Sequence, residues 1–334
     1  MRRQFVNDPA DLVNEALEGF EAAQRGRIRW NRDPSYVVRA DSGRRRGKVA
    51  LVSGGGSGHE PLHVGYVGPG MLDAAVPGAV FASPTAIQIQ AASRAADSGG
   101  GVVHIVKNYT GDVLNFRIAA ELLEDDGIRA EAVFVDDDVA SDTGDGEGPG
   151  RRGTAAVIAV EKLCGAAAER GDDLDEIVAL GRRITSGART FSVALAAGAH
   201  PGQGRPSFDL ADDEIEFGVG IHGERARQRH PFAPVRDLVP EMVDRVRDPL
   251  GLGRGEHVIA IVNGLGSTHD LELYAIHREL VQVLAKEGIV IDRALVGTYL
   301  TSLDMAGCSI TLIRSDDDLV DLWDAPVSTP ALTW

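Results

Sequence analysis

Short apolar segments alternate with amphipathic ones through the first half of the chain. Val102–Val106 is an apolar run of strand length, flanked by the helically spaced segments Pro84–Ala96 and Leu114–Leu123. Two more apolar runs are expected to be strands, Lys48–Ser53 and Glu131–Val135. Apolar strands of this length between helices are typical of a mostly parallel sheet, so the pattern predicts an α/β protein.

The pattern changes in the second half, where the first expected strands are separated by a long loop rich in proline and glycine, His200–Pro206. This change of pattern places a domain boundary near Arg189 and predicts two domains, residues 1–188 and 189–334. The elements expected after a polar, glycine-rich loop at Ser141–Gly150 are helices at Thr154–Glu169, Asp175–Thr185, Val235–Val246 and Asp270–Lys286, and strands at Thr190–Ala196, Ile215–Val219, His257–Val262, Val290–Leu295 and Ser309–Ile313.

Composition and charge exclude several classes of function. The chain has 334 residues and a formal net charge of −16, which repels duplex nucleic acid and anionic membrane surfaces. No apolar run reaches the roughly 20 residues that span a bilayer, and the basic N-terminus lacks the apolar core of a signal peptide. Cys164 and Cys308 each lie in an apolar stretch, so we expect buried thiols in a reducing compartment, the cytoplasm.

A glycine-rich segment, Gly54–Gly58, directly follows the strand expected at Lys48–Ser53 and leads into His59. In open α/β sheets, ligands bind beyond the carboxyl ends of strands, and glycines there let backbone N–H groups approach a ligand. The segment lacks the lysine of a P-loop, and His59 stands where a dinucleotide fingerprint has its third glycine. It is therefore either a small-ligand loop or a tight turn between a strand and a helix.

His59 and His63 also match the H-E-x-x-H pattern of zinc proteases. That chemistry needs both histidines one turn apart on the same helix, and Pro61 between them disrupts such a helix. We therefore expect no metal site here.

Polar residues gather after the strand expected at Val102–Val106, among them Lys107, Thr110 and Asp112. A lysine in this place can orient hydroxyl groups, and an aspartate can act as a general base when it is correctly placed. The alternative is structural, with Thr110 or Asp112 capping the helix that follows. The residues alone leave both interpretations open.

His222 stands between Ile221 and Gly223, just after the strand expected at Ile215–Val219. Gly220 and Gly223, on either side of Ile221 and His222, expose the ring and let it move close to a small ligand. A neutral imidazole nitrogen is a competent nucleophile toward a carbonyl carbon. A single histidine is more often structural, so this alternative stays open as well.

These three segments, in this order, resemble the K subunit of dihydroxyacetone kinases. The resemblance runs along nearly the whole chain and includes SGGGSGHEP, VKNYTGDVLNF, EFGVGIHGE, TSLDMAGCSITL and LWDAPVSTPALTW. It implies two α/β domains built on mixed or parallel sheets, with the substrate site at the domain interface. The C-terminal tail is then a candidate to pack back on the first domain, and the family is usually a homodimer.

The resemblance also implies a role for each motif. His222 attacks the ketone carbon of dihydroxyacetone and holds the ketose as a hemiaminal, while His59 and Asp112 act as acid and base on its hydroxyl groups. The residues implied to bind the substrate are Gly56, Ser57, Gly58, His59, Lys107 and Asp112. The expected activity is phosphoryl transfer to the captured ketose, giving dihydroxyacetone phosphate.

The chain shows no recognisable cradle for a nucleotide. The resemblance therefore implies that ADP or ATP and magnesium bind to a separate L subunit, which phosphoenolpyruvate recharges through the phosphotransferase system. Arg225 and Ala226 follow the GIHGE segment where the family usually has Pro-Gly, so the preferred ketose stays open. The alternatives are a ketose-sensing co-regulator of transcription, which needs no acid–base pair, and a kinase subunit for a four-carbon ketose such as erythrulose.

Overall fold

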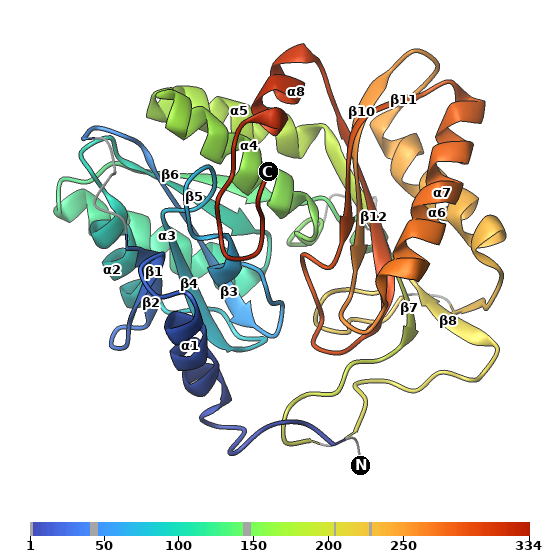
Figure 1. Cartoon of the computed structure of the whole chain (residues 1–334), viewed down its shortest axis with the longest axis horizontal. Helices are drawn as coiled ribbons and strands as arrows, with labels where there is room; N and C mark the ends of the chain where they lie inside the picture. The colour runs from blue at the N-terminus through green and yellow to red at the C-terminus, as the bar shows by residue number, and fades with distance from the viewer. Residues whose placement is uncertain (1–2, 41–45, 143–147, 204, 227–228) are drawn as a thin grey trace. The chain divides into compact units, whose positions relative to one another are not determined.

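The structure, a computed structural model, describes residues 3–40, 46–142, 148–203, 205–226 and 229–334, so part of the loop expected at Ser141–Gly150 lies outside the described residues. The described chain forms two compact units, each with a six-stranded sheet (Figure 1). The N-terminal unit contains Gln4–Val135, Val157–Arg183 and Leu322–Trp334, and the C-terminal unit contains Asp136–Ala156 and Ile184–Asp321. Both units are discontinuous in sequence, whereas the pattern suggested one boundary near Arg189. The predicted α/β class with mixed sheets is confirmed.

The sheet of the N-terminal unit has the strand order β1-β2-β4-β3-β5-β6. Strands β4, β3, β5 and β6 are parallel, and the antiparallel hairpin β1–β2 forms one edge. The strands are β1 (Ile28–Asn31), β2 (Tyr36–Arg39), β3 (Ala50–Ser57), β4 (Ala74–Val80), β5 (Val102–Lys107) and β6 (Ala130–Val135). The helices are α1 (Leu12–Ala23), α2 (Ala86–Ala96), α3 (Thr110–Asp125), α4 (Ala156–Arg170) and α5 (Leu174–Ser186), with a 3₁₀ turn at Val64–Tyr66.

Alternation along the strands decides which helix covers which face of this sheet. Val52 of β3 lies in a core with Ile89 of α2 and Phe116 of α3. The next residue, Ser53, points to the opposite face because successive strand residues do. That face is covered by α4, and its Glu161 contacts His63, which in turn contacts Ser53. Two layers of helices therefore enclose the parallel strands, and a polar group of α4 reaches the middle of the sheet.

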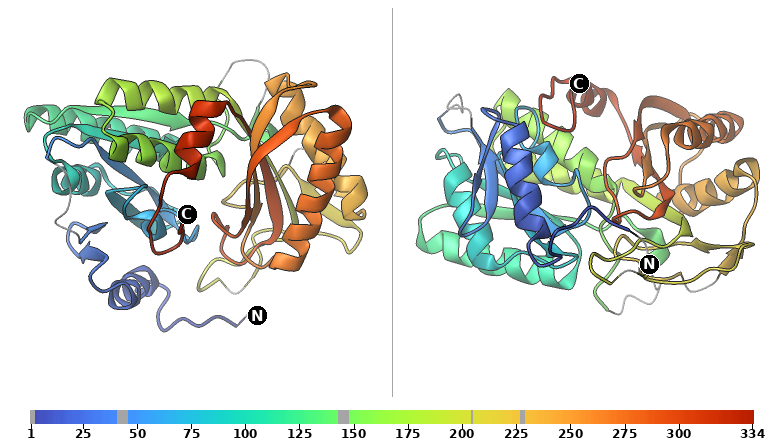
Figure 2. Two further views of the ribbon diagram at one scale, coloured as in Figure 1. Left: turned by 45° about the horizontal axis from the view of Figure 1, so that its top comes forward. Right: turned by 60° about the horizontal axis from the view of Figure 1, so that its bottom comes forward.

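The sheet of the C-terminal unit has the order β11-β10-β12-β7-β8-β9, in which only β10 and β11 are parallel. Figure 2 shows α6 and α7 side by side on one face of it, where their apolar residues form the core. The strands are β7 (Ala188–Ala196), β8 (Glu214–Phe217), β9 (Arg229–Pro231), β10 (His257–Gly264), β11 (Val290–Gly297) and β12 (Ala306–Arg314). The helices are α6 (Val235–Leu250), α7 (Asp270–Glu287) and α8 (Asp317–Asp324), with a 3₁₀ turn at Val139–Ser141.

Strand β4 is the longest strand that the sequence pattern missed. Its sequence, AAVPGAV, contains a proline and a glycine, which argue against a central strand. Pro77 lies beyond Ala74 and Ala75, the two residues that pair with β2. The missing N–H of Pro77 therefore removes no bond of that ladder. The short strands β1, β2 and β9 and the helix α8 were also not expected.

The segment 326–334 lies against the loop that follows β3 in the N-terminal unit. The amide of Ser328 donates to the carbonyl of Pro69 at 2.9 Å, and the amide of Ala331 donates to the carbonyl of Gly65 at 2.9 Å. These bonds join the two ends of the unit's sequence. The loop is thereby held in part by residues more than two hundred positions away along the chain.

Gly165 of α4 is a position where a side chain has no room. A Cβ there would lie 2.3 Å from the carbonyl oxygen of Gly70 and 2.6 Å from Cα of Met71. We expect Gly165→Ala to lower the free energy of unfolding by about 1–3 kcal/mol, because overpacking displaces the backbone. Urea denaturation measures the change.

The matched control for this prediction is Gly19→Ala in α1, where a Cβ would meet nothing within 4 Å. This substitution is expected to raise the free energy of unfolding by about 0.5–1 kcal/mol, the usual gain of alanine over glycine inside a helix. Equal effects of the two substitutions would contradict the packing argument.

Candidate active site

Strand β3 runs through the glycine-rich segment to Ser57, so the segment is not the strand-to-helix turn that was its structural alternative. Its glycines let neighbouring backbone come close. A Cβ on Gly54 would lie 2.7 Å from the carbonyl oxygen of Val76, and one on Gly56 would lie 2.6 Å from the amide nitrogen of Ala82. Glycine is therefore what allows β4 and the loop after it to pack against the end of β3.

His59 lies in the turn after β3 and has 1% of its surface exposed. Its ring stacks on that of Phe81, with centroids 5.0 Å apart and planes inclined by 20°. Phe81 has a φ of 56°, in the left-handed region that strains a non-glycine residue. A strained loop after β4 thus sets the plane of the His59 ring.

The second motif places two charged groups at the carboxyl end of β5. Lys107 ends the strand, Asp112 lies in the first turn of α3, and both are buried. A Cβ on Gly55 would lie 2.6 Å from Nζ of Lys107 and 3.7 Å from Oδ2 of Asp112, so both groups approach the backbone of β3. The N-cap of α3 is Tyr109, and Oδ1 of Asp112 has no hydrogen-bond partner among the described residues. Capping therefore does not account for Asp112, and its Oδ1 is available to accept a bond from a ligand.

Two further buried groups join this cluster. His63 Nε2 lies 2.8 Å from Lys107 Nζ, and His63 Nδ1 lies 2.6 Å from Oε1 of Glu161 and 3.0 Å from Oγ of Ser53. No role for His63 or Glu161 was expected from the sequence. The signal that could have found Glu161 is an isolated acid directly after the apolar stretch 155–160.

Burial dominates the ionisation of these groups. Burial raises the pKa of the Glu161 carboxyl to about 8, although the charge of Lys107 opposes the change. Burial and the Lys107 charge lower the pKa of the His63 imidazole well below its ordinary range. Burial also lowers the pKa of Lys107, against the attraction of Asp112 and Glu161. His63 is therefore neutral near neutral pH.

In the C-terminal unit, His222 follows β8 and is held by Glu224. The backbone amide of His222 donates to Oε2 of Glu224 at 2.9 Å, and Nδ1 of its ring lies 3.1 Å from Oε1. Burial opposes ionisation of Glu224, but the bond and charge of His222 together with Arg152 hold the pKa of this carboxyl at about 2. The carboxylate is thus ionised at neutral pH and accepts the proton of Nδ1.

A second ion pair supports Glu224 from behind. Arg152 lies 3.8 Å from Glu224 and donates from Nε to Oδ2 of the buried Asp138 at 2.7 Å. A Cβ on Gly220 would lie 2.1 Å from Glu224 Oε2 and 2.4 Å from Arg152 Nη1, so a side chain at this position would displace the ends of both charged side chains. Asp138, Arg152 and Glu224 therefore form a charged chain that ends at the His222 ring.

Arg225 fixes the path of the chain after His222. Its Nε and Nη2 donate to Oε1 of the buried Glu216 at 2.8 and 2.6 Å, and the amide of Ala226 donates to Oε2 of Glu216 at 3.0 Å. Where the family pattern has Pro-Gly, this chain thus ties the exit of the loop to β8.

The structure brings Lys107 and Asp112 together near Gly55 of β3 and places His59 in the turn after that strand, all in the N-terminal unit. His222 belongs to the C-terminal unit and is described there with its own partners. Of the loop residues expected to bind substrate, Ser57 and Gly58 lie at the end of β3 and in the turn after it.

The Dak1 domain family matches residues 18–331 of the chain. This chain belongs to the Dak1 domain family. The chain is 45% identical, over 99% of both sequences, to the PEP-dependent dihydroxyacetone kinase, dihydroxyacetone-binding subunit of Escherichia coli (strain K12). The solved dihydroxyacetone kinase of C. freundii matches with a TM-score of 0.89 and 34% identity, over 99% of this chain and 60% of that one. A dihydroxyacetone kinase operon co-activator also matches with a TM-score of 0.89 and 34% identity, over 95% of this chain and 97% of that one.

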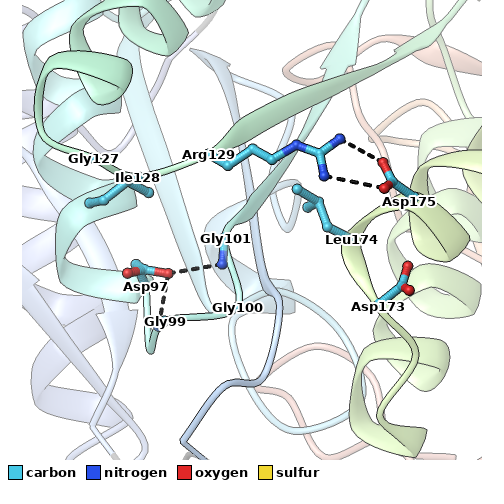
Figure 3. Close-up of a pocket in the computed structure, with 10 residues that line it drawn as sticks. All are labelled: Asp97, Gly99, Gly100, Gly101, Gly127, Ile128, Arg129, Asp173, Leu174 and Asp175. Carbon is cyan, nitrogen blue, oxygen red and sulfur yellow. Dashed lines mark hydrogen bonds and ion pairs between the residues drawn. The ribbon is translucent and has the colours of Figure 1, made fainter.

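A polar hollow of about 370 Å³ in the N-terminal unit of this Dak1 domain is a different feature (Figure 3). It lies at the amino ends of β5 and β6, whereas the motifs lie at the carboxyl ends. Its charged groups already have partners, since Arg129 pairs with Asp175 at 2.6 Å and Asp97 accepts the amides of Gly99 and Gly101. None of the residues expected from the sequence lines it.

The H-E-x-x-H pattern does not lie on a helix in this Dak1 domain. His59 and His63 lie on turns rather than on one helix, and His63 is engaged by Glu161 and Lys107. Among the residues that the structure describes, no group of three or more His, Cys, Asp or Glu side chains could hold a metal ion.

No helix among the described residues combines the length and the apolar character needed to cross a membrane.

Proposed function

We propose that this Dak1 domain is the dihydroxyacetone-binding subunit of a dihydroxyacetone kinase and that it holds its substrate covalently on His222. The observation that carries the proposal is the bond between His222 and Glu224. Because the ionised carboxylate can only accept, the ring proton sits on Nδ1 and the lone pair of the imidazole sits on Nε2. The printed names of the full-length relatives supply the substrate class.

Capture is an addition to the ketone. The Nε2 lone pair of His222 forms a bond to the carbonyl carbon, the C=O π pair moves to oxygen, and that oxygen takes a proton to give a hemiaminal. The ring then carries a positive charge, which the Glu224 carboxylate balances. We assign the proton transfer to the carbonyl oxygen to His59, whose ring plane is fixed by Phe81.

Activation of the terminal hydroxyl falls to Asp112. Its Oδ1 accepts the hydroxyl proton as the oxygen attacks phosphorus, while Lys107 orients the substrate next to it. The support is that the buried Oδ1 of Asp112 has no hydrogen-bond partner among the described residues and that Asp112 acts on the Lys107 ammonium electrostatically. The loop residues Gly56, Ser57 and Gly58 are proposed to contact the same substrate as Asp112 and Lys107.

Covalent capture explains how a ketose is distinguished from a polyol. Glycerol has the same hydroxyl groups as dihydroxyacetone but no carbonyl carbon, so it cannot form the bond to His222. A reaction that one compound cannot undergo separates the two more sharply than a difference in hydrogen bonds.

The phosphoryl donor is proposed to come with a second protein. We place ADP or ATP and magnesium on an L-type subunit that the phosphotransferase system recharges; the C. freundii kinase chain extends well beyond the part that this chain covers. We further propose a cytoplasmic homodimer. The free, buried Cys164 and Cys308 fit a reducing compartment. The sensor and erythrulose alternatives are not favoured by the full-length relatives named as kinase subunits.

The test is an enzyme-coupled assay for dihydroxyacetone phosphate. We expect no product from the purified chain with dihydroxyacetone, ATP and magnesium, because phosphoryl transfer needs metal and positive charge around the transferred group. Product should appear when an L-type subunit charged with nucleotide is added. Glycerol in place of dihydroxyacetone is the control and should give no product.

Two outcomes would contradict the proposal. Sustained ATP-dependent turnover by the isolated chain would show that it carries its own nucleotide site. The second outcome uses an L-type subunit that carries nucleotide and is active with its own K subunit. If it forms no product with this chain, the kinase function is excluded.

A further inference from the structure

A continuous hydrogen-bonded chain leads from Lys107 away from Asp112 into the layer of α4. It runs from the Lys107 ammonium to His63 and from His63 to Glu161. The three side chains are 1%, 4% and 0% exposed. Bulk water therefore does not screen them, and each group feels the charge of the next.

The geometry of this chain fixes its donors and acceptors. The hydroxyl of Ser53 donates to the carbonyl of Ile105 at 2.7 Å, so toward His63 it can only accept. The proton of the neutral ring therefore sits on Nδ1 of His63 and points at Ser53 and Glu161. Nε2 keeps its lone pair and accepts from the ammonium of Lys107.

Packing alone gives no reason for a carboxyl at position 161. The helix stretch Ala156–Val160 before it is fully buried and apolar. Oε2 of Glu161 has no hydrogen-bond partner among the described residues, and an unpaired buried carboxyl oxygen destabilises a fold. Glu161 therefore weakens the fold, yet it contacts Lys107 of the candidate site through His63. This combination points to a role of Glu161 in that site.

We propose that Glu161 and His63 are positioning residues for Lys107: through the imidazole of His63, Glu161 holds the Lys107 ammonium beside Asp112 and keeps it charged. The expected effect on turnover rests on the proposed function. The expected effect of Glu161 on the charge of Lys107 does not. When Glu161 is ionised, its charge favours the ammonium form of Lys107 across a neutral ring. When Glu161 is protonated, that support is lost.

The groups that act on this cluster come from four elements. They are Asp112 of α3, Glu161 of α4, Lys107 of β5, and His59 and His63 of the loop after β3. Asp112 and Glu161 both favour a charged Lys107, while burial opposes it. Removing the Glu161 charge should therefore lower the pKa of Lys107 further.

Nuclear magnetic resonance of the full chain tests this directly. The lysines of the sequence are Lys48, Lys107, Lys162 and Lys286, so their labelled side chains can be assigned by single substitutions. In the wild type, the Lys107 signal should respond to two ionisations, its own and that of Glu161 at about pH 8. In Glu161→Gln, the step at about pH 8 should disappear and the Lys107 step should move to lower pH.

Kinetics with the partner subunit give the second readout. Glu161→Gln keeps an acceptor for His63 but no charge, and we expect kcat to fall about tenfold to a hundredfold, as for other groups that support a site from behind. The wild-type kcat should rise as the pH passes about 8 and Glu161 ionises, and this rise should be absent from the variant. If the two residues act as one chain, the double variant His63→Asn with Glu161→Gln should be no slower than His63→Asn alone.

His104→Asn is the matched control. His104 is equally buried and lies on β5 with Lys107. Its ring bonds Oγ of Ser93 at 2.9 Å and takes no part in the hydrogen bonds between Lys107, His63 and Glu161. This variant should lose stability but keep both the Lys107 titration and the pH profile of kcat.

Three results would overturn the proposal. The first is a single ionisation step for Lys107 in the wild type, which needs no variant. The second is an unchanged Lys107 titration in Glu161→Gln. The third is an equal effect of His104→Asn on the pH profile. If the wild type shows the two steps but makes no product with the L-type subunit, the proposed function fails while the electrostatic inference stands.

Discussion

The His222→Ala variant is expected to lose covalent capture of dihydroxyacetone and at least about 10³-fold of its turnover with the L-type subunit, because the reacting hydroxyl is no longer held in place. No other group in the proposal forms a bond to the ketone carbon. Dihydroxyacetone labelled with ¹³C at the carbonyl measures capture directly. Its signal should move to the region of saturated carbons with the wild type and stay at the ketone position with the variant.

His257→Ala is the matched control for this experiment. His257 begins β10 in the same unit, is half exposed, and bonds Asp292 at 2.7 Å. Its loss should leave both capture and turnover unchanged. A shifted carbonyl signal with His222→Ala would mean that another nucleophile captures the ketose.

The second large effect concerns Asp112. Asp112→Asn keeps the size of the side chain but cannot take up a proton, so we expect kcat to fall by about 10²–10⁴. Binding of dihydroxyacetone, measured by calorimetry, should survive because His222 still captures the ketone. Asp125→Asn, an exposed position in the last turn of the same helix, is the control and should behave as the wild type.

Asp112→Asn separates the roles of the two units. Wild-type turnover by this variant would show that the hydroxyl proton leaves by another route. Loss of binding together with turnover would instead make Asp112 a residue that holds the substrate.

The sequence predicts the residues of the candidate site that belong to a local sequence pattern. Gly54–Gly58 and Lys107 directly follow apolar strands, and the carboxyl ends of parallel strands share one edge of a sheet. The neighbourhood of Lys107 and Asp112 follows from their short separation across a strand and a helix start. These features need no knowledge of the rest of the chain.

The parts that were missed depend on distant residues. His63 and Glu161 are 98 positions apart, and only the packing of α4 on the sheet brings them together. Strand β4 was not predicted because it contains Pro77. A proline is tolerated there only because the pairing with β2 ends before it. The discontinuous units depend on α4 and α5 returning to the first sheet, which no local pattern indicates.

The tail segment Leu322–Trp334 has a consequence for synthesis on the ribosome. It packs against the loop after β3, which carries His59 and His63, and it belongs to the N-terminal unit. Domains commonly fold in order as the chain emerges. Here the N-terminal unit cannot reach its final packing until translation has passed through all of the C-terminal unit. The loop that bears the acid of the proposed site is therefore among the last parts of the protein to mature.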